Sequence, residues 1–547
     1  MASRPFDEIG AAFDTRWHHH DASRQSSDLA LECDVVIIGT GAGGGTAAYL
    51  LAQAGLDVVM LEEGPLRTAR DFVLEERAAY PGLYQEAAAR KTADKAIGIL
   101  QGRAVGGSTL VNWTTSLRTP EATLAHWRKV HGWMFAEPQA MAPWFAAAEQ
   151  RHAVAPWALP PNENNGVLAR GLHALGGQAK VVPRNVHGCW NLGACGMGCP
   201  TNAKQSSLVA LLPAALERGA KLVSRARVER LQLAAGQVVA VDCCALDELG
   251  QVDRSRRVTV RSRHVVLAAG AIGSPAVLLR SAAPDPYDQL GRRTFLHPVV
   301  LSSARMPTAV NGHAGAPQTV YSDDYLWPAD GSAGFKLEVP PIHPLIAALV
   351  QRGHGAGHRQ AMRELDHAQI TLALMRDGFH DDSRGGAVRL DGYGDPVLDY
   401  PMTPYLFAGM RRAYLAMAEI QFAAGALAVS PVHDDARAYR SWGEARAAIG
   451  ALPMQALRVK AVSAHVMGGC AMSGDERLGV VDLDGRHHQI ENLSLCDGSI
   501  FPTSIGANPQ LSIYAFAARI AAGLGERLAN PGREGAAVSA SGLDATG

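Results

Sequence analysis

The stretch that most constrains the fold of this chain runs from Cys33 to Gly64 and reads CDVVIIGTGAGGGTAAYLLAQAGLDVVMLEEG. A short apolar run at residues 35–38 precedes Gly39, Gly41 and Gly44, which are spaced as GxGxxG. An alanine-rich stretch at helical spacing follows, and a second apolar run ends in two glutamates. The order of strand, tight glycine turn, helix and strand is typical of the first unit of a doubly wound α/β sheet.

The glycine turn predicts a binding site for a dinucleotide. Glycine is needed there because a side chain would block the close approach of a pyrophosphate. The phosphates then lie on free amide groups at the positive end of the helix. An acidic residue about twenty positions further on is placed to hydrogen-bond a ribose hydroxyl, and Glu62 and Glu63 both stand there. The alternative is a glycine-rich turn in some other strand–helix unit.

The composition predicts a large folded protein. The chain has 547 residues, of which 47% are hydrophobic and 19% charged, so two or three domains with buried cores are expected. The formal net charge of -1 gives no general attraction to nucleic acid or to anionic membranes. No apolar run approaches the roughly 18 residues that span a bilayer, and no transmembrane segment is expected. Residues 1–30 lack a secretory signal pattern, which predicts a cytoplasmic protein, with export alongside a signal-bearing partner as an alternative.

A second loop of small residues lies between Gly102 and Pro120, in the text GRAVGGSTLVNWTTSLRTP. Gly106, Gly107 and Ser108 are followed four residues later by Asn112. Such a loop lets the backbone approach a flat or phosphorylated ligand closely. An ordinary connecting loop is an equally good interpretation of these residues taken alone.

The side chains best suited to catalysis lie near the C-terminus. His465 precedes a Gly-Gly pair, Asp497 follows a short apolar run, and Asn508 precedes a proline and a helical pattern. An imidazole suits proton abstraction from an alcohol because its unperturbed pKa is close to neutral. An asparagine amide can hydrogen-bond a substrate oxygen while it stays uncharged. The sequence does not place these side chains together, and structural roles are the alternative.

Five blocks, in the right order along the chain, resemble the glucose–methanol–choline (GMC) family of FAD-dependent alcohol oxidases and dehydrogenases. They are GTGAGG with the later LEEG, GRAVGGSTLVN, GAIGSPAVLLRS, LGRRTFLHP, and HVMGGCAM with the later CDGSIFPTSIGANP. The resemblance covers nearly the whole chain, from Asp34 to Ala522. The Gly-Gly pair after His465 and the Asn-Pro pair at 508–509 are most similar to the long-chain alcohol oxidase and cholesterol oxidase branches.

The resemblance implies FAD as the cofactor. The family's cofactor contacts correspond here to Gly39, Gly41 and Gly44 for the pyrophosphate, Glu62 for the adenosine ribose, Val228 for the adenine side, Gly106, Gly107, Ser108 and Asn112 for the flavin, and Asp497 for the ribityl–phosphate region.

The implied reaction is oxidation of an alcohol to an aldehyde or ketone by hydride transfer to flavin N5. His465 matches the family's catalytic histidine and would accept the hydroxyl proton. Asn508 matches the second catalytic position and would orient the oxygen. The branch similarity predicts a hydrophobic or long-chain alcohol, while oxygen, a quinone and a cytochrome all stay open as electron acceptors. A flavoprotein that binds or senses without turnover is a further alternative.

Three cysteines, Cys189, Cys195 and Cys199, form a separate pattern. Thiolates in glycine-rich turns can hold an iron–sulfur cluster, and the segment is similar to that of cluster-bearing sugar dehydrogenases in the family. A cluster would make this protein the catalytic subunit of a dehydrogenase that passes electrons to a cytochrome or quinone. The segment is also similar to that of long-chain alcohol oxidases, including Lys204 and Ser206, and this similarity favours structural thiols. Zinc or a disulfide are the remaining alternatives.

The predicted architecture is α/β, with a Rossmann-type FAD-binding domain on a discontinuous chain path and an α+β substrate domain with a mixed or antiparallel sheet. The expected parts are an N-terminal arm at 1–30, an FAD-binding domain at 31–298 with a cap-like segment at 65–100 and a Cys-rich loop at 185–206, a substrate domain at 299–462, a C-terminal part of the FAD-binding domain with the catalytic residues at 463–528, and a disordered tail at 529–547.

Overall fold

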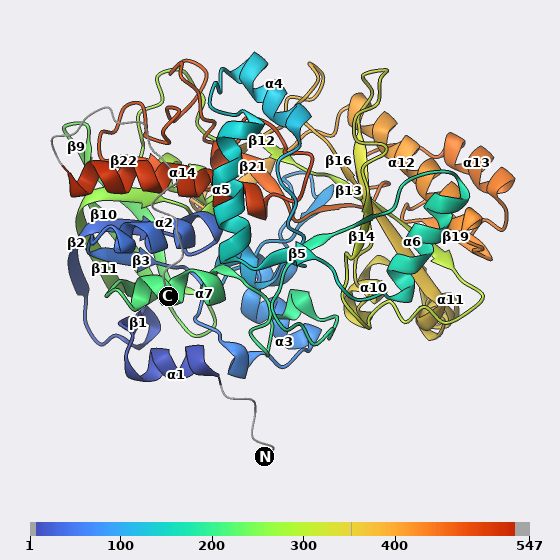
Figure 1. Cartoon of the computed structure of the whole chain (residues 1–547), viewed down its shortest axis with the longest axis horizontal. Coiled ribbons are helices and arrows are strands. Elements are labelled where there is room, and N and C mark those ends of the chain that lie inside the picture. Colours follow the sequence, from blue (N-terminus) through green and yellow to red (C-terminus); the bar gives the residue numbers. More distant parts are fainter. Residues whose placement is uncertain (1–6, 352, 531–547) are drawn as a thin grey trace.

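The computed structural model describes residues 7–351 and 353–530 of the chain (Figure 1). The glycine-turn unit forms as predicted, with strand β2 (Leu29–Ile38), helix α2 (Ala42–Gln53) and strand β3 (Val58–Leu61). The last four residues of β2 and all four of β3 are buried, because α2 covers one face of this pair. The two strands run parallel, with Val35 opposite Val58 and Ile38 opposite Leu61.

The first sheet is built around this parallel pair. The order of its strands is β1-β8-β3-β2-β11-β10-β9, and β22 also pairs with β11. The pairs from β1 to β11 are parallel, as is β11 with β22, whereas β11, β10 and β9 form an antiparallel extension. The further strands of this sheet are β1 (His19–Asp21), β8 (Lys221–Ser224), β9 (Ala226–Ala234), β10 (Gln237–Leu246), β11 (Val252–Leu267) and β22 (Leu493–Leu495).

The C-terminal part of the chain returns to this first sheet. Strand β22 adds to β11 in parallel, and helix α14 (Gln510–Ala529), drawn in red in Figure 1, packs on α2 and on α5 (Pro138–Arg151). Trp127, Trp133, Phe501 and Phe516 are buried beneath these helices with ring centroids 4.8 to 6.4 Å apart. Large aromatic side chains stabilise a core strongly because each removes a large apolar area from water. The segment that carries His465 and Asn508 is thereby anchored to the nucleotide-binding sheet.

A second sheet forms the other half of the molecule, on the right in Figure 1. Its order is β4-β20-β13-β16-β15-β14-β6, with β19 also paired to β13, and it is antiparallel except for the β4–β20 pair. The strands are β4 (Ile97–Ile99), β6 (Lys180–Val181), β13 (Val299–Arg305), β14 (Val320–Ser322), β15 (Phe335–Glu338), β16 (Ala368–Met375), β19 (Ala428–Pro431) and β20 (Ala461–Ser463). Helix α12 (Pro404–Ala423) packs on this sheet and on α6 (Glu163–Ala174) and α13 (Trp442–Ala451).

Smaller elements connect the two halves. A four-stranded sheet has the order β18 (Pro396–Asp399), β17 (Gly386–Leu390), β12 (Arg292–Leu296) and β21 (Val466–Gly468), and β5 (Val154–Pro156) pairs with β7 (Pro183–Asn185). The remaining α-helices are α1 (Glu8–Thr15), α3 (Glu76–Leu83), α4 (Glu121–His131), α7 (Ser207–Ala210), α8 (Leu212–Leu216), α9 (Gly270–Arg280), α10 (Pro344–Val350) and α11 (Gly355–Arg363). None of the helices in the described residues is long and apolar enough to cross a bilayer.

The predicted fold class is confirmed, and the structure refines where its parts lie. The expected N-terminal arm carries α1 and supplies the edge strand β1 to the first sheet. The substrate-side sheet recruits β4 and β6 from outside residues 299–462. Helix α14 runs to Ala529, and most of the predicted tail, residues 531–547, lies outside the described residues.

Candidate active site

The glycine turn forms a tight cradle at the N-terminus of α2. Gly39 has φ of 98°, and a Cβ built there would lie 2.3 Å from the Ala268 carbonyl oxygen. Gly41 caps α2 without a side-chain hydrogen bond. A Cβ on Gly107 would lie 2.8 Å from the Gly41 Cα. The two glycine loops, far apart in sequence, therefore meet, and they leave backbone amides at a helix N-terminus for an anionic group.

A cavity of about 1130 Å³ starts at this cradle and ends at His465 and Asn508. It exceeds the ~300–1,000 Å³ of ordinary ligand pockets, as expected of a site that takes a dinucleotide and a substrate together. Most of the residues predicted for the cofactor and for catalysis line it: Gly39, Gly41, Glu62, Gly107, Ser108, Asn112, Val228, His465, Asp497 and Asn508.

Two predicted cofactor residues, Gly44 and Gly106, do not line the cavity but shape the turns. A Cβ on Gly44 would lie 1.8 Å from the Gly39 carbonyl oxygen, so glycine is required for α2 to pack on the turn. Gly106 has φ of 97° and donates its amide proton to Thr40 Oγ1 at 2.9 Å. The donor set and the cradle fit a bound FAD.

Glu62 is buried and partly engaged by the chain itself. Its Oε2 accepts hydrogen bonds from the amide and hydroxyl of Thr40 at 3.1 and 2.6 Å, and its Oε1 accepts from the Gly64 amide at 2.8 Å. Burial raises the pKa of Glu62. A carboxylate offers about four acceptor sites, so about one is left for a ribose hydroxyl.

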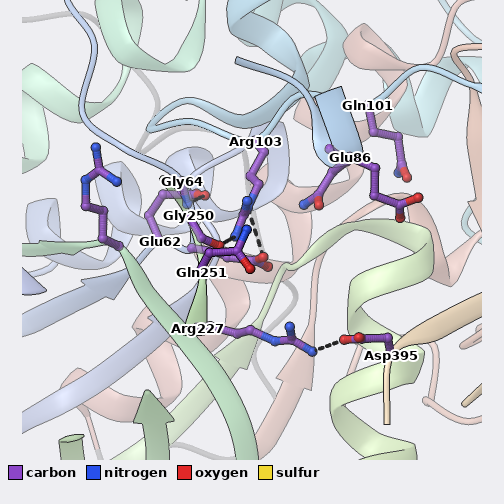
Figure 2. A network of polar contacts seen from close by, with 12 residues as sticks. Glu62, Gly64, Glu86, Gln101, Arg103, Arg227, Gly250, Gln251 and Asp395 are labelled. Atoms are coloured by element: carbon purple, nitrogen blue, oxygen red, sulfur yellow. Dashed lines mark hydrogen bonds and ion pairs between the residues drawn. The ribbon is translucent and has the colours of Figure 1, made fainter. Parts of the chain in front are cut away.

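Charged side chains surround Glu62 at this end of the cavity (Figure 2). Arg103 pairs with Glu63 at 3.0 Å and donates to the Gly250 carbonyl at 3.1 Å. Arg227 pairs with Asp395 at 2.5 Å, a contact that Figure 2 marks with a dashed line. Asp395 precedes β18, so the four-stranded sheet that connects the two halves also borders this end of the cavity.

Asp497 joins the end of β22 to the start of α9. Its Oδ2 accepts from the Gly270 amide at 2.7 Å and from the Ser274 hydroxyl at 2.6 Å, and its Oδ1 accepts from the Ser499 amide at 2.8 Å. The predicted cofactor residue thus also fixes the backbone that borders the cavity.

Lys204 supports the loop of Ser108 and Asn112 by hydrogen bonds to its backbone. The Lys204 ammonium is buried and donates to the carbonyls of Leu110, Asn112 and Cys195 at 2.8, 2.7 and 2.6 Å. Burial lowers the pKa of Lys204 to about 8, although the neighbouring thiols oppose this shift. Sequence reasoning mentioned Lys204 but gave it no role.

The three cysteines of residues 185–206 do not form a metal site. Cys189 Sγ accepts from the Asn191 amide, Cys195 Sγ from Arg184, and Cys199 Sγ from the Lys204 amide. Within the part of the chain that the structure describes, no three His, Cys, Asp or Glu side chains are arranged to hold a metal ion. The iron–sulfur hypothesis therefore finds no support, and the segment serves to buttress the loop of Asn112.

His465 lies against a second buried histidine, His297. Their Nδ1 atoms are 3.0 Å apart. Burial, together with the positive charge of Lys336, lowers the pKa of His465 to about 3. Burial also lowers the pKa of His297 well below its usual value. Both rings are therefore neutral at physiological pH.

The hydrogen bonds around this pair determine its tautomers. The Gly506 amide donates to Nε2 of His297 at 3.0 Å, so that nitrogen carries a lone pair and the His297 proton lies on Nδ1. Nδ1 of His465 then accepts from His297. Neutral His465 consequently carries its proton on Nε2, the ring nitrogen turned away from His297. Sequence reasoning missed His297, although it stands in the block LGRRTFLHP.

Asn508 contacts two buried charged residues of β15 that the sequence analysis also missed. Lys336 Nζ donates to Asn508 Oδ1 at 2.5 Å, and Asn508 Nδ2 donates to Glu338 Oε2 at 3.3 Å. The available signal was the text FKLEV, in which two charges alternate with apolar residues inside a buried strand.

One wall of the cavity is apolar. Val299, Leu372 and Leu374 form a small buried cluster, with Trp113 and Val462 packed against it, and all five line the cavity. The site thus combines a nucleotide cradle, an imidazole and amide able to hold a hydroxyl, and an apolar wall.

Comparisons with known proteins agree with this geometry. Family models described as GMC oxidoreductase match residues 80–299 and 381–517, and one described as FAD binding domain matches residues 34–71. An uncharacterized GMC-type oxidoreductase of Mycobacterium tuberculosis is 33% identical over 527 residues, which cover 92% of this chain and 79% of that protein. The long-chain-alcohol oxidase FAO1 of Arabidopsis thaliana is 26% identical over 90% of this chain and 67% of its own length.

Solved structures share the fold at low sequence identity. Pyridoxine 4-oxidase from Mesorbium loti superposes with a TM-score of 0.64 at 20% identity, covering 89% of this chain and 98% of that one. A formate oxidase from Aspergillus oryzae superposes with a TM-score of 0.65 at 15% identity, covering 91% and 98%. The chain belongs to the GMC family of FAD-dependent oxidoreductases.

Proposed function

We propose that this protein oxidises a hydrophobic primary or secondary alcohol to the corresponding aldehyde or ketone. The observation that carries the proposal is the convergence of His465 and Asn508 on the same cavity as the glycine cradle. When bound there, FAD supplies the hydride acceptor. The chain supplies the groups that hold the hydroxyl oxygen and receive its proton.

His465 is the proposed acceptor of the hydroxyl proton. To accept it on Nε2, His465 must first carry its own proton on Nδ1, where it donates to His297. His297 must then carry its proton on its own Nε2, which faces the Gly506 amide. The hydrogen bond from Gly506 to His297 is lost in this tautomer, at a cost of about 1–3 kcal/mol. This is small against the ~8–23 kcal/mol by which enzymes lower barriers, so the less populated tautomer of the pair is accessible as the reactive form.

The apolar wall supports a hydrophobic substrate. Leu372, Leu374 and Val299 offer no hydrogen bonds to a sugar, whereas an alkyl chain gains free energy by leaving water for such a surface. The long-chain-alcohol oxidases among the relatives point to the same substrate class. Residues 31–298 and 463–528 are the proposed FAD-binding part, and residues 299–462 with β4 and β6 the proposed substrate part.

The test is anaerobic mixing of the FAD-loaded protein with primary alcohols of increasing chain length and with sugars as controls. We expect long-chain alcohols to bleach the flavin absorbance and to yield one aldehyde per flavin reduced, while sugars leave it unchanged. Bleaching by sugars alone would overturn the substrate class, and no bleaching by any alcohol would overturn the reaction. Readmission of oxygen, or addition of a quinone or cytochrome, then identifies the electron acceptor.

A further inference from the structure

Two buried charges lie behind Asn508 on strand β15. Lys336 and Glu338 are two residues apart and therefore point to the same face of the strand. Their side chains are 3% and 0% exposed, and Lys336 Nζ lies 2.7 Å from Glu338 Oε1. The Lys336 ammonium also lies 5.6 Å from the centre of the Tyr321 ring.

Stability alone is a weak explanation for a buried ion pair in this position. Removing two charges from water costs several kcal/mol per ion, and apolar residues of similar volume are often equally or more stabilising. Phe335 and Leu337 alternate with the two charges and point to the other face of β15, so the charged face of the strand is formed by Lys336 and Glu338. A role outside stability is therefore the better explanation of the pair.

The pair holds both ends of the Asn508 amide. An ammonium only donates hydrogen bonds and a carboxylate only accepts them. Lys336 donates to Asn508 Oδ1 at 2.5 Å, while Glu338 Oε2 accepts from Asn508 Nδ2 at 3.3 Å. Rotating the amide by half a turn would place the NH₂ group against the ammonium and the carbonyl oxygen against the carboxylate. Only one of the two orientations of the amide is thus compatible with its surroundings.

Glu338 is itself fixed by a further chain of hydrogen bonds. Its Oε2 accepts from Gln318 Nε2 at 2.5 Å, and Gln318 Oε1 accepts from the Thr115 hydroxyl at 2.7 Å. Gln318 and Thr115 line the cavity together with Asn508. The position of the amide is therefore tied to the loop that borders the cofactor site.

We propose that Lys336 and Glu338 act as a pair of positioning residues, which hold the Asn508 amide so that its remaining N–H donates to the oxygen of the bound alcohol. This inference rests on the proposed function. It also gives Lys336 a second effect, because its positive charge is among the causes that keep His465 neutral.

The first test is a mutant cycle on the FAD-loaded protein. The variant Lys336→Met/Glu338→Leu removes both charges together, because removing one alone would leave the other buried and unpaired. We expect kcat/KM for a long-chain alcohol to fall about 100-fold, as when one positioned donor to a reacting oxygen is lost. Asn508→Ala should cause a similar loss, and combining all three substitutions should cost nothing more, because the pair acts only through the amide.

Ser302→Ala is the matched control, since Ser302 makes a buried hydrogen bond to Gln421 within the same half of the molecule. We expect it to leave kcat/KM unchanged. The proposal would be overturned if the losses in kcat/KM of the separate variants multiply in the triple variant. It would also be overturned if Lys336→Met/Glu338→Leu keeps the native kcat/KM. If the double variant does not fold, Lys336→Gln/Glu338→Gln, which removes both charges but retains a donor and an acceptor beside Asn508, should keep at least about a tenth of the native kcat/KM, and a loss as large as that of Asn508→Ala would overturn the proposal.

The second test does not depend on turnover. In protein labelled with ¹⁵N-asparagine, the Nδ2 protons of Asn508, assigned through Asn508→Asp, should exchange with water more slowly in the native protein than in Lys336→Met/Glu338→Leu. Equal exchange rates in the two proteins would overturn the positioning role of the pair even if alcohols are oxidised. If the Asn508 Nδ2 protons exchange more slowly in the native protein but no alcohol reduces the flavin, the positioning role of Lys336 and Glu338 stands and the proposed function is rejected.

Discussion

His297 Nδ1 and His465 Nδ1 lie 3.0 Å apart, and the other ring nitrogen of His297 accepts from the Gly506 amide at 3.0 Å. The Gly506 amide therefore determines which ring nitrogen of His465 carries the proton. This couples the chemistry at His465 to the backbone of the segment that also carries Asn508.

The first prediction concerns this pair in the resting protein. In ¹⁵N-histidine-labelled protein at neutral pH, His465 should carry its proton on Nε2 and His297 on Nδ1, with assignments from His465→Gln and His297→Gln. The nitrogen chemical shifts distinguish the tautomers. A proton on Nδ1 of His465 would contradict the two hydrogen bonds inferred here, from the Gly506 amide to His297 and from His297 to His465.

The second prediction concerns stability in acid. His264 is buried against Ser494, and burial lowers its pKa to about 3. Below its ordinary pKa of about 6.5 the unfolded chain binds a proton that the native His264 does not, so the free energy of unfolding falls as the pH falls toward 3. The expected loss is up to about 1.4 kcal/mol per pH unit from each such histidine.

Urea unfolding at about pH 7 and about pH 5 measures this loss. In His264→Asn, the free energy of unfolding should decrease less between the two pH values than it does in the native protein. His18→Asn, at an exposed position just before β1, is the control and should leave the decrease unchanged. An equal decrease in the native protein and in His264→Asn would contradict the prediction.

The third prediction concerns Lys204. Lys204→Met leaves three buried carbonyls without their donor, at up to about 1–3 kcal/mol each. We expect FAD affinity to fall at least about tenfold, a loss of about 1.4 kcal/mol, because the loop of Asn112 loses its support. Flavin release, followed by fluorescence, measures the affinity.

Lys221→Met is the control for Lys204. Lys221 makes a half-exposed pair with Asp57 at 3.0 Å, and such pairs contribute only ~0–1 kcal/mol. Its removal should leave FAD affinity unchanged. Equal losses of affinity in both variants would mean that Lys204 has no specific role in the cofactor site.

The fourth prediction concerns the substrate. Each buried methylene contributes about 0.8 kcal/mol, so kcat/KM should rise about fourfold per carbon until the alkyl chain passes the apolar wall. Leu374→Gln should reduce this slope, whereas Leu301→Gln, near the same cluster but outside the cavity lining, should not. A native kcat/KM that is independent of chain length would contradict an apolar substrate site.

The sequence was sufficient for those features that depend on local pattern. The glycine turn, the strand and helix order and the positions of His465 and Asn508 follow from periodicity, turn chemistry and family blocks. Gly44 and Gly106 show the limit of this reasoning, because Gly44 is required by a close backbone contact and Gly106 by its positive φ, and neither lines the cavity.

The groups that surround the catalytic positions could not be predicted. His297 follows β12, Lys336 lies on β15 and Lys204 lies in the cysteine loop. Only the folded chain brings them to His465, to Asn508 and to the loop of Asn112. A buried charge in a strand signals some polar partner, but the sequence does not contain the identity of that partner. The contacts of Lys336 and Glu338 with Asn508 could therefore be recognised only in the structure.

The most direct test of the central claim is the rate of anaerobic flavin reduction by a long-chain primary alcohol, compared between the native protein and His465→Gln with equal FAD content. The account predicts rapid reduction with aldehyde formation in the native protein and a rate at least about 100-fold lower in the variant, since one positioned acid–base group contributes about 10²–10⁴-fold. Equal rates in the two proteins would contradict the role of His465, and no reduction in the native protein would contradict alcohol oxidation itself.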